Sequence, residues 1–143
     1  MITFVLDASV AVKWAMPLAK EPLIDESLRF FKRYTDGEID FVVPDVFWAE
    51  VGSVLWKGVR RGRWSRDDAQ NVAADFKARD FVTVPSQFLL PEALRLAFAY
   101  DQSVYDCLYA ALAVESKTDL ITADERLANA LAARLPVKWL GAL

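Results

Sequence analysis

Four acidic side chains of this sequence are flanked by apolar residues, where a negative charge has little structural use. Asp7 follows the run FVL, Glu50 follows VFWA, Asp106 lies within SVYDCLYAALA, and Asp124 lies within LITADERLA. Carboxylates that are buried together repel one another and lose hydration unless a cation lies among them. If the fold gathers these four acids, the simplest stabilising cation is a metal ion.

The rest of the composition narrows the chemistry. The chain has no histidine and one cysteine, Cys107, so it has no Ser/His or Cys/His nucleophile pair and no internal disulfide, and the familiar His/Cys zinc sites are unsupported. A site made only of carboxylate oxygens favours Mg²⁺ or Mn²⁺. Such an ion supports hydrolysis of a phosphodiester, and the sequence leaves open whether one ion or two would bind.

The size of the chain predicts a single domain spanning residues 1–143, because 55% of the side chains are hydrophobic and can form a full core. The formal charge of −3 excludes bulk electrostatic binding of nucleic acid, so a nucleic-acid partner would be held locally. Asp7 interrupts the apolar N-terminal run, and no apolar run is long enough to cross a membrane. We expect a soluble cytoplasmic protein with no membrane partner.

The elements that must position the acids alternate along the chain. Short runs rich in Val, Ile, Phe and Trp predict five strands, at Thr3–Leu6, Phe41–Val43, Phe81–Val84, Leu120–Thr122 and Val137–Leu140. Their lack of in/out alternation is typical of strands covered on both faces. Helical segments lie between them, which indicates an α/β fold with a mainly parallel five-stranded sheet.

Helix end signals place the remaining elements. Pro22 opens a helix to about Tyr34, Asp45 caps one that ends before Gly62, and Ser65 caps a polar helix to about Arg79. Pro91 lies in the first turn of a helix to about Tyr100, and Ser103 caps an apolar helix through Glu115. The last helix begins at Ala123 or Asp124 and closes before Pro136.

Each acid also has a structural interpretation that stays open. Glu50 has no basic residue three or four positions away, so a solvated helix face explains it poorly. Asp106 could complete a capping box with Ser103, and Asp124 could be an N-cap. Asp7 ends the first strand, and ligands collect beyond the carboxyl ends of parallel strands.

Hydroxyl and basic side chains provide weaker candidates. Ser9 and Thr122 lie two residues from Asp7 and Asp124, and their hydroxyls could cap a helix or orient a carboxylate. Basic residues gather beyond the helix that carries Glu50, and the candidates for contact with a nucleic-acid backbone are Arg60, Arg61 and Arg63. Cations that complement a helix C-terminus are an equally good explanation.

The motifs VLDAS, WAEV, YDCLYAALA and ITADERL resemble the four acidic motifs of the PIN domain, and their order and the chain length resemble the VapC-type toxins of VapBC toxin–antitoxin modules. The resemblance implies a three-layer α/β/α Rossmann-like fold and Mg²⁺- or Mn²⁺-dependent endoribonuclease activity. It assigns Asp7, Glu50, Asp106 and Asp124 to the metal-binding catalytic cluster, with Asp7 and Asp106 as direct ligands and Ser9 and Thr122 supporting them.

The resemblance also implies partners. These are an RNA substrate, a second copy of the chain, and a VapB-type antitoxin whose C-terminal segment blocks the site. The helices Glu21–Arg33 and Val46–Arg61 would be the walls of the antitoxin groove. Candidate anchors there are Phe30, Phe31, Trp48 and Trp56, although core packing is the better explanation for any single one of them.

Two alternatives differ in class. A receiver-like signalling domain also clusters acids around Mg²⁺, but it needs an acidic pair after the first strand and an acid ending the third strand. Here Asp7 is alone and the third run ends in Val84 and Pro85. A catalytically inactive PIN-like interaction protein is disfavoured because all four acids are present.

Overall fold

A parallel sheet forms the centre of the molecule. The computed structural model describes residues 1–18 and 20–143, and across these the sheet has five strands in the order β3-β2-β1-β4-β5. The strands are β1 (Ile2–Leu6), β2 (Ile39–Pro44), β3 (Val82–Val84), β4 (Leu120–Thr122) and β5 (Val137–Trp139). Every strand pairing is parallel, which confirms the predicted fold class.

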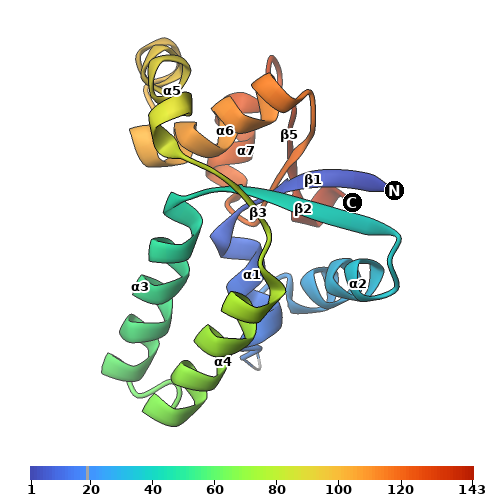
Figure 1. Cartoon of the computed structure of the whole chain (residues 1–143), viewed down its shortest axis with the longest axis vertical. Helices are drawn as coiled ribbons and strands as arrows, with labels where there is room; N and C mark the ends of the chain where they lie inside the picture. Colours follow the sequence, from blue (N-terminus) through green and yellow to red (C-terminus); the bar gives the residue numbers. More distant parts are fainter. Residues whose placement is uncertain (19) are drawn as a thin grey trace.

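Helices cover both faces of the sheet, so the domain has three layers. Figure 1 shows α1 to α4 on one side of the strands and α5, α6 and α7 on the other. The helices are α1 (Ala8–Ala15), α2 (Ile24–Thr35), α3 (Val46–Arg60), α4 (Arg66–Arg79), α5 (Ser86–Tyr100), α6 (Val104–Ser116) and α7 (Glu125–Leu131), and a 3₁₀ turn follows at Leu140–Ala142. None of the helices in the described ranges combines the length and apolarity needed to traverse a bilayer.

The helix starts follow the predicted signals with two differences. Ser65 and Ser103 cap α4 and α6, accepting hydrogen bonds from the backbone N–H groups three residues later at 3.0 and 3.1 Å. Pro91 lies inside α5 rather than in its first turn, because the helix already begins after Pro85. Asp45 precedes α3, but its side chain does not cap it; the carboxylate instead accepts hydrogen bonds from the backbone and hydroxyl of Ser86.

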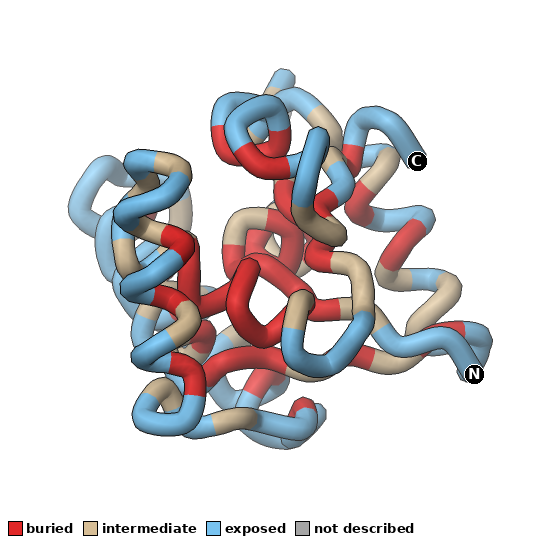
Figure 2. The backbone as a smooth tube through the Cα atoms, turned by 90° about the horizontal axis from the view of Figure 1, so that it is seen from above, coloured by how far each residue is buried: buried red, intermediate tan, exposed pale blue. Residues whose placement is uncertain are grey.

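The core lies along the central strands and α6. In α6 every residue from Cys107 to Ala113 is buried, as expected for a helix that is apolar nearly all round. The last two residues of β1 and all of β4 are buried as well, and Figure 2 shows the buried segments gathered at the centre of the molecule. The acids at the ends of these elements therefore lie next to a low-dielectric interior, where an unpaired charge is costly.

Three of the four candidate aromatic anchors pack inward. Phe30 is buried and contacts Phe4 and Phe41, Phe31 stacks on Trp14, and Trp48 stacks on Phe81. Trp56 is 59% exposed on α3. Among these four residues, only Trp56 is largely available to a partner.

Candidate metal centre

The strand order creates a crevice at the carboxyl edge of the sheet. The chain runs outward from β1 to β2 and β3, then returns to place β4 on the opposite side of β1. Ligands of open α/β sheets bind where the strand order reverses in this way. Asp7 follows β1 at this point, and its backbone N–H donates to Ile121 O of β4 at 3.2 Å.

Hydroxyl groups hold the buried Asp7 carboxylate. Its Oδ2 accepts hydrogen bonds from Thr122 Oγ1 at 2.7 Å and from Ser9 Oγ at 3.0 Å. Burial raises the pKa of Asp7, these hydroxyls oppose the rise, and the charge of Asp106 adds to it. Ser9 and Thr122 therefore orient Asp7.

The same hydroxyls reach the turn after β4. Ser9 Oγ accepts from the Ala123 N–H at 3.1 Å, and Thr122 Oγ1 accepts from the Asp124 N–H at 3.1 Å. Each hydroxyl thus bridges Asp7 and the segment that carries Asp124. The two strand ends form one hydrogen-bonded unit.

Glu50 lies in the second turn of α3, facing α6. Burial raises the pKa of Glu50, the Tyr109 hydroxyl opposes the rise, and the charges of Asp7 and Asp106 add to it. Within the described residues, Glu50 Oε1 and the Tyr109 hydroxyl are buried without a hydrogen-bond partner of good geometry. A buried acceptor without a donor is costly, so Glu50 Oε1 is suited to a ligand.

Asp106 lies in the first turn of α6, where the helix dipole favours a carboxylate. Burial raises the pKa of Asp106, the Ser103 hydroxyl opposes the rise, Asp124 adds to it, and Arg126 opposes it. Its backbone N–H completes half of the predicted capping box with Ser103. Capping leaves the Asp106 carboxylate available.

Asp124 is the N-cap of α7, which confirms its structural interpretation. Its Oδ1 accepts from the Leu127 N–H at 3.2 Å, and its Oδ2 lies 3.6 Å from a guanidinium nitrogen of Arg126. Capping occupies Oδ1 of Asp124, whereas Oδ2 faces the exposed guanidinium of Arg126. Asp124 can therefore cap the helix and still present an oxygen to the crevice.

The four acids share this edge and influence one another in pairs, but among residues 1–18 and 20–143 no three of them form a compact ligand cluster. The four side chains still fit a hard divalent cation, because all their donor atoms are oxygens and their negative charges repel one another. They also include Glu50 Oε1, which has no hydrogen-bond partner among the described residues.

Two residues at this edge were missed by sequence reasoning. Tyr109 follows Asp106 by three residues on the same helix, and that helical spacing could have indicated a side chain shared with the site. Arg126 adjoins Asp124 and also donates to Gln102 Oε1 at 3.2 Å. Its proximity to Asp106 depends on the packing of α6 against α7, so the sequence carried no signal for it.

The three arginines expected to contact a nucleic-acid backbone lie away from the acidic edge. Arg60, Arg61 and Arg63 are exposed at the C-terminal end of α3, where the Arg60 guanidinium lies 5.3 Å from the Trp56 ring centre. Ten residues of helix separate Glu50 from Arg60, which corresponds to about 15 Å. Any RNA that contacts both must extend along α3.

Comparison with known proteins supplies a family. The family model described as the PIN domain matches residues 4–131. Ribonuclease VapC3 of Pyrobaculum aerophilum is 36% identical over 84 residues, which are 56% of this chain and 63% of that protein. The chain thus aligns with less than two thirds of this relative.

Solved structures extend the likeness of fold over nearly the whole chain. The crystal structure of PAE2754 from Pyrobaculum aerophilum has a TM-score of 0.72 at 22% identity, covering 99% of this chain and 85% of that one. A toxin–antitoxin complex from Klebsiella pneumoniae has a TM-score of 0.64 at 14% identity, covering 94% and 95% of the two chains. VapBC2 from Rickettsia felis, bound to a DNA fragment from its promoter, has a TM-score of 0.62 at 14% identity, covering 96% and 98%.

Proposed function

Because this chain belongs to the PIN domain family, we propose that it is a divalent-metal-dependent endoribonuclease that acts as the toxin of a type II toxin–antitoxin pair. Its relative VapC3 is named a ribonuclease, and two proteins of similar fold were solved as toxin–antitoxin assemblies. The observation that carries the proposal is the set of four carboxylates at the switch point of the sheet, where Asp106 interacts with the charges of Asp7, Glu50 and Asp124.

In this proposal Asp7 and Asp106 are direct ligands of Mg²⁺ or Mn²⁺. Glu50 and Asp124 hold a second ion or the attacking water, or assist proton transfer. When bound, the ion supplies Lewis-acid stabilisation of the charge that develops on the phosphodiester and makes a nearby water more acidic.

The protein groups contribute positioning. Thr122 and Ser9 hold Asp7 in one orientation, and the sheet bond from Asp7 to Ile121 keeps both strand ends in register. The Tyr109 hydroxyl lies beside Glu50 in the interior, where it can donate to the ionised carboxylate. A prearranged set of oxygens lowers the cost of ordering the site during reaction.

The test is cleavage of a mixed RNA pool by purified protein free of antitoxin, with Mg²⁺ and with EDTA. We expect EDTA to abolish cleavage, and we expect Asp7→Asn and Asp106→Asn to reduce it by more than about 100-fold. Asp101→Asn is the matched control, because Asp101 is exposed at φ 54°, a conformation that Asn also tolerates. Wild-type protein that cuts no RNA, or Asn variants that cut equally well, would contradict the nuclease proposal and favour an inactive interaction protein.

We propose that Arg60, Arg61 and Arg63 contact the RNA backbone beyond the catalytic edge. Changing all three to Gln should weaken RNA binding and flatten its salt dependence by about 0.7 in logarithmic slope for each phosphate that is no longer neutralised. An unchanged slope would assign these residues to complementing the dipole of α3.

We propose that α5 provides the face of a homodimer. Leu90, Leu94 and Phe98 recur every four residues and are 51%, 42% and 80% exposed, so they form an apolar stripe on the outer surface.

The antitoxin is proposed to occupy the α2 and α3 side, where the exposed Trp56 is the remaining aromatic anchor. Copurification with the product of a small neighbouring gene would test that partner.

A further inference from the structure

An ion pair lies beside the acidic edge and takes no part in the interactions described above. Lys13 of α1 donates through Nζ to Glu21 Oε1 at 2.9 Å and to the Pro22 carbonyl at 3.0 Å. The Lys13 side chain is only 12% exposed and that of Glu21 is 32% exposed. Long charged side chains are rarely this buried unless they are paired, so the pair fixes the position of the ammonium group.

The pair lines a hollow that adjoins the acidic edge. This hollow has a volume of about 280 Å³, and its lining includes Ser9 and Asp124 together with Lys13 and Glu21. Ser9 and Lys13 are four residues apart on α1, so both face the same side of the helix. Val54, one turn after Glu50 on α3, adds an apolar surface.

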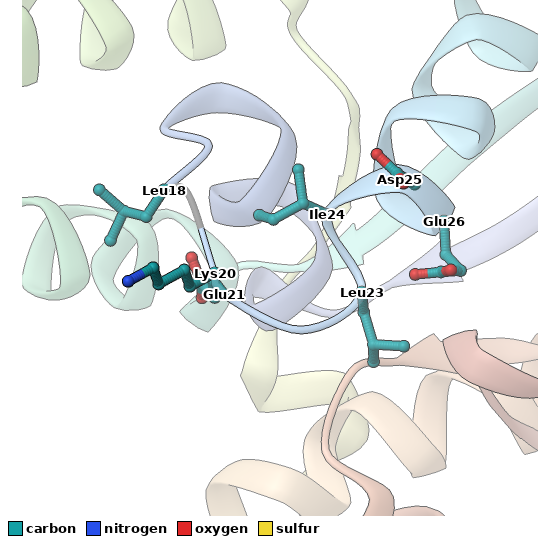
Figure 3. Close-up of a pocket in the computed structure, with 7 residues that line it drawn as sticks. All are labelled: Leu18, Lys20, Glu21, Leu23, Ile24, Asp25 and Glu26. Atoms are coloured by element: carbon teal, nitrogen blue, oxygen red, sulfur yellow. The ribbon is translucent and has the colours of Figure 1, made fainter.

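Glu21 belongs to the short segment between α1 and α2. A second hollow of about 390 Å³ is lined by Leu18, Lys20, Glu21, Leu23, Ile24, Asp25 and Glu26 (Figure 3). Glu21 thus lines both hollows and is absent from the buried core, so it can separate from Lys13 without disturbing that core.

An RNA strand, whose phosphates are negatively charged, needs a positively charged group to bind at the 280 Å³ hollow. Without Lys13 the charged groups lining the 280 Å³ hollow would be the Glu21 and Asp124 carboxylates, which repel phosphate. An ammonium has three hydrogens to donate, and two of those of Lys13 are engaged in the described structure. A phosphate can accept the third and compete with Glu21 for the others.

We propose that Lys13 is a substrate-positioning residue that binds a phosphate of the RNA backbone adjacent to the phosphodiester that is cut, and that Glu21 holds this ammonium until RNA replaces it. The inference rests on the proposed ribonuclease function and extends it to a residue outside the acidic set. In this arrangement Glu21 competes with substrate. Removing each partner of the same ion pair should therefore have opposite effects on RNA affinity.

The experiment compares Lys13→Gln, Lys13→Arg and Glu21→Gln by steady-state cleavage of one short RNA that the wild type cuts. We expect Lys13→Gln to raise KM about tenfold with little change in kcat, and to reduce the slope of log KM against log salt by about 0.7. Lys13→Arg should restore most of the affinity. Glu21→Gln should lower KM several-fold, although it breaks the same pair.

The same three variants are then compared in the Asp7→Asn protein, which should not cut RNA. Fluorescence anisotropy with EDTA present measures their affinity for this RNA without catalysis. A purely structural pair would make Lys13→Gln and Glu21→Gln lose the same thermal stability and shift KM in the same direction, which would overturn the inference. Cleavage that depends on Asp7 but is unaffected by Lys13→Gln overturns this inference alone. A wild type that neither cuts nor binds RNA overturns both it and the proposed function.

Discussion

Thr122→Val isolates the hydroxyl that joins the two strand ends of the site. Thr122 is completely buried, donates to Asp7 Oδ2 at 2.7 Å, and accepts from the Asp124 N–H at 3.1 Å. Valine has nearly the same shape, so the substitution removes these hydrogen bonds without opening a cavity.

The expected loss follows from these two bonds. A hydrogen bond to a charged group contributes about 1.5–3 kcal/mol, and a buried N–H left without a partner costs about 1 kcal/mol. Burying a methyl group in place of the hydroxyl offsets about 1 kcal/mol. We therefore expect the free energy of unfolding of the metal-free protein to fall by about 1.5–3 kcal/mol.

Urea denaturation followed by circular dichroism measures this loss. Thr118→Val is the matched control, because the Thr118 hydroxyl donates only to the Ser116 carbonyl, at 3.2 Å near the surface, and its removal should cost less than about 0.5 kcal/mol. A loss for Thr122→Val no larger than that of the control would show that the Thr122 hydroxyl does not stabilise the folded protein through Asp7 and Asp124.

A double-mutant cycle with Asp7→Asn tests whether Thr122 acts through the Asp7 charge. A hydrogen bond to a neutral amide is about half as strong as one to a carboxylate. The effect of Thr122→Val should therefore shrink by about 1 kcal/mol in the Asn background. Equal losses in both backgrounds would show that Thr122 stabilises the fold independently of Asp7.

Three other perturbations have defined outcomes. Asp7→Asn should stabilise the metal-free protein at pH 7, because burial raises the pKa of Asp7 and makes its ionised form costly in the folded chain. The stability advantage over the wild type should decline as the pH falls through the folded pKa of Asp7 and should vanish below about pH 3.8. Urea denaturation midpoints measured across this pH range would show the decline. Tyr109→Phe removes the hydroxyl that opposes the raised pKa of Glu50, so the acidic limb of the pH–rate profile should move to higher pH, and an unmoved limb would leave Tyr109 a packing role only. Leu94→Glu with Phe98→Glu should convert a dimer to a monomer in light scattering, and an unchanged mass would remove α5 as the dimer face.

Much of the fold was predictable because strand and helix signals in this chain are local. The five predicted strands agree with the observed ones to within two residues at each end, and Ser65 and Ser103 cap the helices that they precede in sequence. The exception is α1, which sequence reasoning did not predict. Its residues ASVAVKWA are apolar enough to fit a buried strand, and Asp7, which caps this helix by accepting from the Ser9 N–H, was interpreted only as an acid of the site.

The acids were predictable for the same reason, whereas their surroundings were not. A carboxylate after a buried strand or in an apolar helix is visible as a local conflict between charge and burial. The Tyr109 hydroxyl beside Glu50 and the Lys13 pair with Glu21 arise from packing between separate elements, or between a helix and the segment beyond it. Such pairings depend on the tertiary structure, which hydrophobic periodicity and capping signals do not specify.

In the proposed metal site, the attachment of the four acids to different kinds of element has a consequence for ion selectivity. Asp7 and Asp124 are fastened to adjacent strands through the Asp7–Ile121 bond and the Thr122 hydroxyl, so the separation of their backbones is set by the sheet. Glu50 and Asp106 are carried by helices, whose small rigid shifts can change the width of the crevice. Mg²⁺ needs oxygens at about 2.0–2.1 Å, whereas Ca²⁺ accepts about 2.3–2.6 Å. How closely α3 and α6 can approach the fixed strand pair would therefore decide which ionic radius the centre accepts.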